Sequence, residues 1–355
     1  MTITIDCRMI EASGVGVYLR GCLPWLLKSS NKFLLLGDSG KLRPFAENTA
    51  NAAVIDCKTK TFSLNELFFF PRSILQKINS SALFFSPFFN IPGGIKIPVY
   101  TTIHDIIFPD MPGITSVAGL LIRMWFFRRA GKKSKKIFTV SEFSKSRIEY
   151  HLGTSKPVVV THSAIQPAFL LYSGTVRNKK NETIIFIGNI KKHKGLDCLL
   201  EAFSLARAEG LPHRLIIIGN RDNFRSFDSA FLQKIDSLGK EAVAFTGFIS
   251  DEELMKQLSS AALLVQPSLY EGFGLPPLEA MVLGTRALIS DIPVFKEIYG
   301  DFPVTFFRTG DREDLKNKLM ELLFRKEPVP LVLPKELSHK YTFEKTASAV
   351  LRGLE

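Results

Sequence analysis

The stretch that decides the fold is Gln266–Gly284, QPSLYEGFGLPPLEAMVLG. The apolar run Leu263–Gln266 predicts a buried strand, and the glycines that follow it predict a loop. Pro276 and Pro277 then mark the start of a helix. Glycines let backbone amides approach a ligand, and a helix N-terminus favours an anion. The stretch therefore predicts a strand–loop–helix unit whose loop meets phosphate.

The same alternation of strand and helix extends over the whole chain. We expect seven strands between Thr2 and Thr161, and five more between Thr183 and Ser290. The polar segment Ser173–Asn181 separates the two sets. A chain of 355 residues exceeds the size at which one core stops growing. We therefore predict an α/β fold of two Rossmann-like domains, residues 1–172 and 182–338, facing each other across a cleft.

Two carboxylates lie in the phosphate-binding stretch, Glu271 before the glycine loop and Glu279 inside the helix. A carboxylate beside phosphate is useful when it accepts hydrogen bonds from hydroxyls, as sugar and ribose provide. The alternative is that Glu279 only complements the helix dipole and that Glu271 is a surface residue. The spacing leaves both interpretations open.

A second glycine turn followed by cations occurs at Ile187–Leu196, IGNIKKHKGL. Cations at the end of a strand can stabilise the charge on a departing diphosphate without a metal. Lys194 is the main candidate, and Lys191 or Lys192 is a further one, although a solvated loop of lysines would look similar. No D-x-D motif occurs, which argues against a metal-chelating site.

The first half offers two weaker signals. The strand Val99–His104 ends in a histidine that can hydrogen-bond a sugar hydroxyl, although a histidine at a strand end is more often structural. Gly14 and Gly16 form a glycine loop between the first strand and the next helix. Leu19 stands where a dinucleotide fingerprint has its third glycine, so NAD binding is not expected.

These motifs resemble a known family. Glu271, Gly272, Phe273, Gly274, Pro276, Glu279 and Ala280 look like the E-x7-E signature of retaining glycosyltransferases of family four, which have the GT-B fold. The resemblance extends over nearly the whole chain. It implies that Glu271 lies by the donor sugar, that the amides of Phe273, Gly274 and Leu275 hold the diphosphate, and that Glu279 binds the ribose.

The resemblance also assigns roles outside this signature. Lys194 would contact the phosphates, His104 the donor sugar, and residues 339–355 would form a helix that packs back on the N-terminal, acceptor-side domain. Two departures stand out: Asn189 and Val17 replace arginines of the family pattern. The remaining residues expected near the donor are Gly14, Gly16, Gly188, Asn189, Lys191, Gly247 and Phe248, the last two near the base.

Positive charge is concentrated in the first half. Residues 1–175 hold 21 Lys/Arg against 10 Asp/Glu, whereas residues 176–355 hold 25 against 24. Within Leu121–Lys136, aromatic residues alternate with cations, which suits a helix on an anionic lipid surface. A solvated run of charge beside a core helix is the alternative. No recognition module accompanies the charge, so nucleic acid is not an expected partner.

The resemblance implies a retaining, metal-independent glycosyltransferase with no cofactor. We expect it to move a hexose, mannose from GDP-mannose, to a saccharide or polyprenyl-diphosphate-linked acceptor in cell-surface polysaccharide synthesis. The expected location is the cytoplasm, peripheral on the inner face of the plasma membrane. The alternatives are a nucleotide-sugar epimerase or a non-catalytic nucleotide-sugar-binding protein of the same fold.

Overall fold

The computed structural model describes residues 1–173, 181–219, 238, 239, 241–324 and 331–355. The chain divides into two compact units. Unit 1 comprises Met1–Gln166 and Tyr341–Glu355, and unit 2 comprises Pro167–Lys340. The expected linker Ser173–Asn181 lies largely outside the described residues.

Unit 1 is built on a seven-stranded parallel sheet in the order β3-β2-β1-β4-β5-β6-β7. Its central strands are buried along nearly their whole length, as expected for a parallel sheet covered on both faces. The strands are β1 Thr2–Asp6, β2 Lys32–Gly37, β3 Ala52–Asp56, β4 Leu83–Ser86, β5 Val99–Thr102, β6 Ser134–Thr139 and β7 Val158–Val160.

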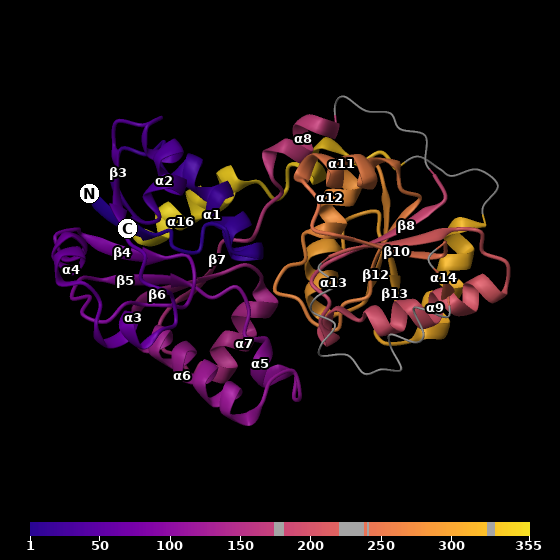
Figure 1. Ribbon diagram of the computed structural model, residues 1–355, viewed down its shortest axis with the longest axis horizontal. Coiled ribbons are helices and arrows are strands. Elements are labelled where there is room, and N and C mark those ends of the chain that lie inside the picture. The colour runs from indigo at the N-terminus through magenta and orange to yellow at the C-terminus, as the bar shows by residue number, and fades with distance from the viewer. Residues whose placement is uncertain (174–180, 220–237, 240, 325–330) are drawn as a thin grey trace. The chain divides into compact units, whose positions relative to one another are not determined.

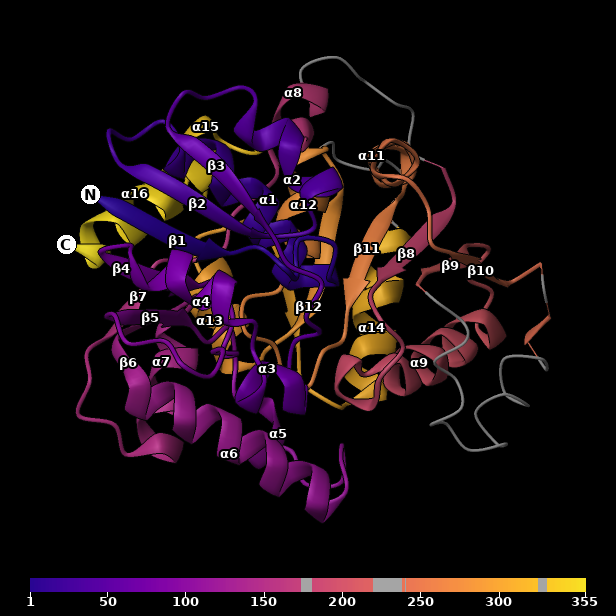
Figure 2. The same cartoon turned by 60° about the vertical axis from the view of Figure 1, so that its left-hand side comes forward.

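Helices cover both faces of this sheet (Figures 1 and 2). The C-terminal helix packs on the first one closely: a Cβ added at Gly21 would lie 2.2 Å from the Phe343 ring. Thr342 caps this last helix by accepting from the Lys345 amide. The helices are α1 Ser13–Leu26, α2 Ser39–Ala46, α3 Leu64–Phe68, α4 Arg72–Asn79, α5 Ile107–Asp110, α6 Val117–Lys133, α7 Glu142–Leu152 and α16 Phe343–Leu354.

Unit 2 repeats the same topology with six described strands, in the order β10-β9-β8-β11-β12-β13. The strands are β8 Thr183–Ile187, β9 Arg214–Ile218, β10 Val243–Gly247, β11 Leu263–Gln266, β12 Arg286–Ser290 and β13 Thr305–Phe307. The helical segments are α8 Pro167–Ser173, η1 Lys192–Lys194, α9 Leu196–Ala208, α11 Asp251–Ser260, α12 Pro276–Val282, α13 Pro293–Tyr299, α14 Arg312–Leu323 and α15 Lys335–Ser338.

The predicted α/β fold with two Rossmann-like units is confirmed. All twelve expected strands are present, and β13 is an additional one. The predicted glycine loop at Gly14 and Gly16 is wrong, because α1 begins at Ser13 and both glycines lie in its first turns. The Gly16 amide already donates to the Ala12 carbonyl.

An ionic network is buried at the carboxyl ends of β1 and β4 in unit 1. Arg8 Nη2 lies 2.6 Å from Asp6 Oδ2 and 2.5 Å from Glu66 Oε1, and the side chains of Asp6 and Glu66 are 3% and 0% exposed. Asn90 Nδ2 donates to the same two oxygens at 3.0 Å. The network holds α3 against the carboxyl end of the central strand β1.

Candidate active site

The order of the strands determines where unit 2 can bind a ligand. Strand order reverses between β8 and β11, which pair in parallel, so the loops at their carboxyl ends diverge to opposite faces of the sheet. Ligands of doubly wound folds bind at this reversal. Gly188–Lys194 follows β8, and Pro267–Leu275 follows β11. The two sequence motifs therefore meet at one edge of one sheet.

A glycine allows these two loops to touch. Gly195 follows the short turn η1, has φ +67°, and a Cβ added to it would lie 1.9 Å from the Pro267 carbonyl oxygen. Only a residue without a side chain fits at that distance and in that conformation. The Leu269 amide donates to the His193 carbonyl at 2.8 Å and closes the contact. Lys194 is thereby held over the β11 loop.

Lys194 and Glu271 form an ion pair at this contact. Lys194 Nζ lies 2.7 Å from Glu271 Oε1 and 2.8 Å from Oε2. Ser268 Oγ donates to Glu271 Oε1 at 2.8 Å, and Gln266 Nε2 donates to Ser268 Oγ at 3.1 Å. The carboxylate therefore accepts from Lys194 and Ser268, which lie on two loops, and the alternative that Glu271 is a surface residue is wrong.

Sequence reasoning missed Gln266 and Ser268. Gln266 is fully buried, and among the described residues its Oε1 has no hydrogen-bond partner. A buried amide oxygen without a partner costs roughly 1–3 kcal/mol unless a ligand or water donates to it. The available signal was a glutamine that ends the otherwise apolar strand β11, five residues before Glu271.

The glycine loop after β11 leads into α12. Gly274 has φ +82°, and a Cβ added to it would lie 2.4 Å from the Phe295 ring. Tyr299 Oη donates to the Gly274 carbonyl, which fixes the backbone at this turn. Phe273 is buried, and Leu275 stands at the N-cap of α12. Pro276 and Pro277 carry no N–H, so the loop amides before them are the donors that remain near this end.

Glu279 lies in the first turn of α12 and is 7% exposed. Burial raises the pKa of its carboxyl to about 7, and the nearby charge of Asp251 adds to the rise. No hydrogen bond to the Glu279 carboxyl occurs among the described residues. A buried carboxyl that receives no hydrogen bond is suited to a hydroxyl ligand, which can donate one to it.

The other residues expected near the donor occupy two places. Gly188, Asn189 and Lys191 lie on the β8 loop that carries Lys194, and Lys191 is exposed. Gly247 and Phe248 lie at the end of the edge strand β10, which β9 separates from β8. Phe248 is 81% exposed. The structure thus brings Lys194 and Glu271 together, whereas Phe248 lies at the end of an edge strand with its side chain exposed.

His104 lies at the carboxyl end of β5 in unit 1 and is half-buried. Its Nε2 donates to the Pro87 carbonyl at 2.9 Å, which leaves Nδ1 as an acceptor. Burial lowers the pKa of His104 to about 4, so its ring is neutral at physiological pH. Tyr18 of α1 packs edge-on against the ring, with 4.9 Å between centroids. The Asp105 carboxylate accepts from the Ile107 amide at the start of α5.

Comparison with known proteins bears on this arrangement. Residues 173–330, which carry both loops, match the family model described as glycosyl transferases group 1. Over these residues the chain is similar to that family. The matched region, called the group 1 domain below for this similarity, coincides with most of unit 2, and the predicted resemblance of its motifs to glycosyltransferases is confirmed.

Curated relatives of this chain include two mannosyltransferases. The serotype-specific mannosyltransferase WbdA of Escherichia coli is 28% identical over 237 residues, which are 62% of this chain and 29% of that protein. The O-antigen chain mannosyltransferase RfbU of Salmonella typhimurium is 29% identical over 202 residues, 56% of this chain and 53% of that protein. The chain thus spans less than two thirds of either relative.

Solved structures show the fold of the whole chain. HepE of Anabaena, in complex with UDP and glucose, superposes with a TM-score of 0.71 at 16% identity over 100% of this chain and 99% of that one. The lipopolysaccharide outer core galactosyltransferase WaaB in its apo form gives a TM-score of 0.64 at 15% identity, over 99% of this chain and 100% of that one. The GT-B fold is confirmed.

The described residues contain neither a metal-binding cluster nor a membrane-spanning helix. In that part of the chain, no three His, Cys, Asp or Glu side chains are grouped to hold a metal ion. Within the same residues, every helix is too short or too polar to span a bilayer. Metal independence and peripheral membrane association both stay predictions.

Proposed function

We propose that this protein is a retaining glycosyltransferase that moves a hexose from a nucleotide sugar to a saccharide or lipid-linked acceptor in cell-surface polysaccharide synthesis. The observation that carries the proposal is the Lys194–Glu271 pair at the strand-order reversal of a group 1 domain. This pair combines a cation for phosphate with a carboxylate for hydroxyls, on loops that a glycine holds in contact.

The pair suggests how the two ends of a donor are bound. A sugar diphosphate carries negative charge that increases as the bond to the sugar breaks, and the Lys194 ammonium can stabilise it. Glu271 keeps Lys194 in place and can accept from a sugar hydroxyl. The buried Glu279 carboxyl is free to accept from the ribose. His104, neutral with Nδ1 as an acceptor, is a further contact for a sugar hydroxyl.

We infer that no catalytic metal is required and that the anomeric configuration is retained. In this mechanism the leaving phosphate oxygen takes the acceptor's proton, and the new glycosidic bond forms on the face that the phosphate leaves. Catalysis then rests on positioning and on fixed positive charge. Lys194 is the ammonium group that the structure brings to the carboxylate of Glu271.

The proposed donor is GDP-mannose. The support is that WbdA and RfbU, which are similar to part of this chain, are named mannosyltransferases. HepE, which is similar in fold, was solved with UDP and glucose, so UDP-glucose is the natural comparison donor. A polyprenyl-diphosphate acceptor and peripheral membrane association are supported by unit 1, which holds 23 Lys/Arg against 12 Asp/Glu.

A donor panel tests the proposal directly. Purified protein is incubated with GDP-mannose, UDP-glucose or UDP-galactose, with and without a polyprenyl-diphosphate-linked saccharide, and nucleotide release and product are measured. We expect acceptor-dependent release of GDP, unchanged by EDTA, and an α-linked product from the α-linked donor, read by NMR of the anomeric proton. Conversion of the donor without acceptor would indicate an epimerase. Donor binding without either reaction would indicate a binding protein.

A further inference from the structure

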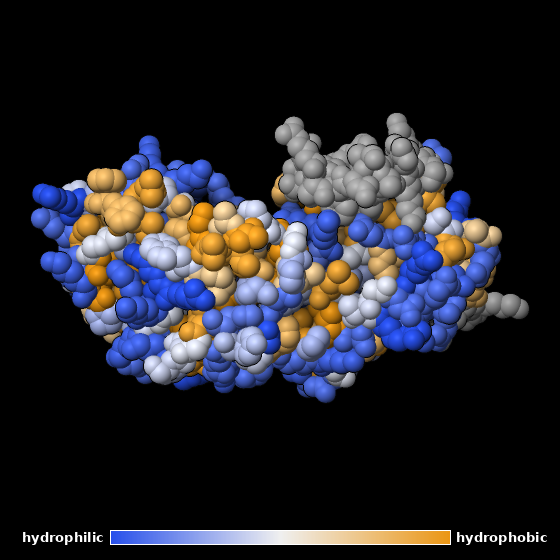
Figure 3. Space-filling view, turned by 90° about the horizontal axis from the view of Figure 1, so that it is seen from below, coloured by the Kyte–Doolittle hydropathy of each residue, from blue (hydrophilic) through white to orange (hydrophobic). Residues whose placement is uncertain are grey.

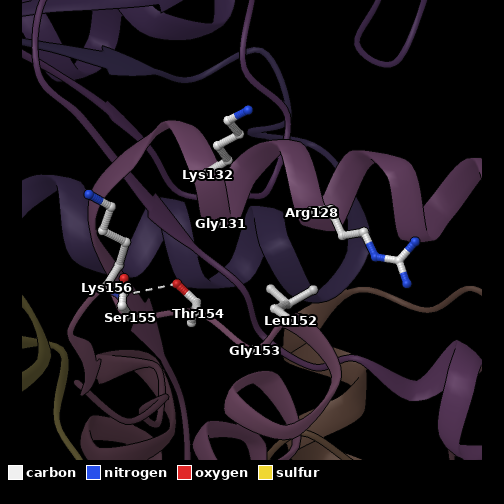
Figure 4. A pocket seen from close by; sticks show the side chains of 8 residues that line it. All are labelled: Arg128, Gly131, Lys132, Leu152, Gly153, Thr154, Ser155 and Lys156. Atoms are coloured by element: carbon white, nitrogen blue, oxygen red, sulfur yellow. Dashed lines mark hydrogen bonds between the residues drawn. The ribbon is translucent and has the colours of Figure 1, made fainter.

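A basic pocket lies on unit 1 between the end of α6 and the turn after α7. It has a volume of about 360 Å³ and is lined by Arg128, Gly131, Lys132, Leu152, Gly153, Thr154, Ser155 and Lys156. Figure 4 shows the charged ends of Arg128, Lys132 and Lys156 spread around it. The lining contains three cations, two hydroxyls and no carboxylate.

These cations are available to a ligand. In the part of the chain that the structure describes, Arg128, Lys132 and Lys156 form no ion pair, and α6 contains five Lys or Arg and no Asp or Glu. Thr154 Oγ1 accepts from the Lys156 amide at 3.1 Å, so its hydroxyl hydrogen can be donated to an anion. The C-terminal ends of α6 and α7 border the pocket, and each carries about half a negative charge. Three full positive charges outweigh them.

An exposed apolar stripe continues from the pocket along α6. Trp125, Leu121 and Val117 lie one helical turn apart on the face that also carries Arg128 and Lys132, and they are 48%, 64% and 76% exposed. Ile122 beside them is 59% exposed. Phe126 and Phe127 of the same helix are buried, so α6 packs on the core through a different face from the exposed stripe.

The neighbouring helix α3 adds to this exposed apolar surface. Leu64, Phe68 and Phe69 are 69%, 69% and 74% exposed. The segment leading into α3 packs on α6, because the rings of Phe62 and Phe126 have centroids 5.0 Å apart. Figure 3 shows apolar side chains beside hydrophilic ones on the face of unit 1 that is seen from below. Charge and apolar surface thus lie side by side.

We propose that this pocket binds the phosphate headgroup of an anionic membrane lipid while Trp125, Leu121 and Val117 enter the acyl region of the same leaflet. This inference deepens the membrane association proposed above and rests on it. The proposed pocket is a discrete site for one headgroup, in contrast to a diffuse electrostatic attraction between unit 1 and the membrane surface. The order of groups along α6 then orients unit 1, with the Val117 end of the helix deeper in the lipid than the Lys132 end.

The dimensions of α6 are compatible with this orientation. Fifteen residues separate Val117 from Lys132, which at 1.5 Å per residue is roughly 22 Å. An interfacial helix buries its apolar face about 5–10 Å into the boundary of headgroups and acyl chains. A moderate tilt of α6 is therefore enough to immerse the apolar end while the pocket stays at the level of the phosphates. A free phosphate or a nucleic acid would leave the stripe exposed to water.

Vesicle binding by charge-matched variants tests the inference. The full chain is mixed with vesicles of phosphatidylcholine alone or with added phosphatidylglycerol, and the lipid concentration for half-binding is measured by co-sedimentation. The pocket variant is R128Q/K132Q/K156Q, and the control K32Q/R43Q/K77Q removes three exposed cations elsewhere in unit 1. We expect the pocket variant to need at least about ten times more lipid, and the control less than about three times.

The possible outcomes separate the competing explanations. Equal shifts for the two variants would overturn the pocket and leave a diffuse electrostatic attraction. Equal binding of the wild type to both kinds of vesicle would overturn membrane association as well. If the pocket variant loses binding to a short DNA duplex and keeps vesicle binding, the site belongs to nucleic acid. If inorganic phosphate stabilises the wild type as much as the vesicles do, the site takes a free anion. Glycosyl transfer to a soluble acceptor, measured on the same preparations, tests the catalytic proposal independently.

Tryptophan fluorescence tests the orientation. The chain has two tryptophans, so W25F leaves Trp125 as the single reporter. Its emission is expected to shift to shorter wavelength with phosphatidylglycerol vesicles and to stay unchanged with phosphatidylcholine alone. An unchanged emission while the protein co-sediments would contradict insertion of the stripe.

Discussion

Lys194 Nζ donates to both carboxylate oxygens of Glu271, although the two residues lie 77 positions apart in the chain. Their side chains are 20% and 10% exposed, so neither charge is fully hydrated. Each residue therefore keeps the other from being an isolated buried charge. If a nucleotide sugar binds the Lys194 ammonium, the Glu271 carboxylate must instead accept hydrogen bonds from Ser268 and from the hydroxyls of the sugar. Stability and catalysis are coupled in this pair, and variants should separate them.

The first prediction concerns this pair. K194M leaves Glu271 unpaired and should lower the free energy of unfolding of unit 2 by about 1–3 kcal/mol, less than for a fully buried pair. E271Q/K194M removes both charges and should recover most of that loss. Transfer should fall by roughly 10²–10³ in both variants, since the cation is missing from both. Thermal unfolding measures the change in stability, and initial rates measure the change in transfer. Recovery of activity in the double variant would contradict the role of Lys194.

The second prediction concerns Glu279 and pH. Its pKa is raised to about 7, so the stability contributed by the protonated form is fully present below the ordinary glutamate pKa and is lost as pH rises through 7. E279Q should therefore be more stable than the wild type at about pH 8, by roughly 2–3 kcal/mol, and similar to it at about pH 4.5. The exposed Glu252 gives the control E252Q, which should follow the wild type at every pH.

E279Q should also bind the donor more weakly. A carboxylate accepts more strongly than an amide from a ribose hydroxyl, which corresponds to about a ten-fold loss of affinity. Calorimetry with the nucleotide sugar measures it. A variant that is stabilised at high pH and binds the donor as well as the wild type would show that Glu279 faces no ligand.

The third prediction concerns His104. Its pKa is lowered to about 4, so the folded protein binds fewer protons than the unfolded chain, and stability is lost as pH falls from about 6.5 towards 4. H104Q can keep a donor for the Pro87 carbonyl and cannot titrate, so its unfolding midpoint should fall less steeply across this range. The exposed His339 provides the control H339Q. Parallel curves for H104Q and the wild type would contradict a lowered pKa of His104 in the folded protein.

The fold followed from the sequence because its signals are local. Runs such as Thr183–Ile187 and Leu263–Gln266 are apolar except for one terminal residue, as expected for a parallel sheet buried on both faces. The strand β13 was missed because it has three residues and only one fully buried side chain. The start of α1 was misplaced because two glycines usually indicate a loop, whereas here they lie in the first turns of a helix.

The sequence predicts the candidate site only in part, because the residues that contact each other there are distant in the chain. The resemblance assigned Lys194 and Glu271 to phosphate and sugar separately, and their ion pair depends on two loops meeting across Gly195. The stretch Leu121–Lys136 has features of both interpretations considered for it, an interfacial helix and a core helix with a solvated run of charge. Phe126 and Phe127 are core residues and Trp125 is exposed, and the helix ends at Lys133 because Ser134 begins β6.

The fourth prediction concerns the buried network of unit 1. R8M leaves the carboxylates of Asp6 and Glu66 buried without a cation and should cost about 3–5 kcal/mol. Neutralising all three residues, D6N/R8M/E66Q, should restore part of that loss. R312M removes the exposed pair with Glu201 and should cost less than about 1 kcal/mol. Equal losses for R8M and R312M in chemical denaturation would show that the network contributes no more than a surface pair.

The last prediction concerns Gly195. G195A places a Cβ 1.9 Å from the Pro267 carbonyl oxygen and keeps φ at +67°, so the β8 and β11 loops must separate. The control G210A also has a positive φ, +95°, but its Cβ meets nothing within 4 Å, so it should cost only about 1–2 kcal/mol and leave transfer unchanged. G195A should lower transfer nearly as much as K194M, because it removes the lysine from Glu271. The two changes act through one contact, so G195A/K194M should transfer no more slowly than K194M alone. Additive losses would mean that Gly195 serves the donor by a route other than Lys194.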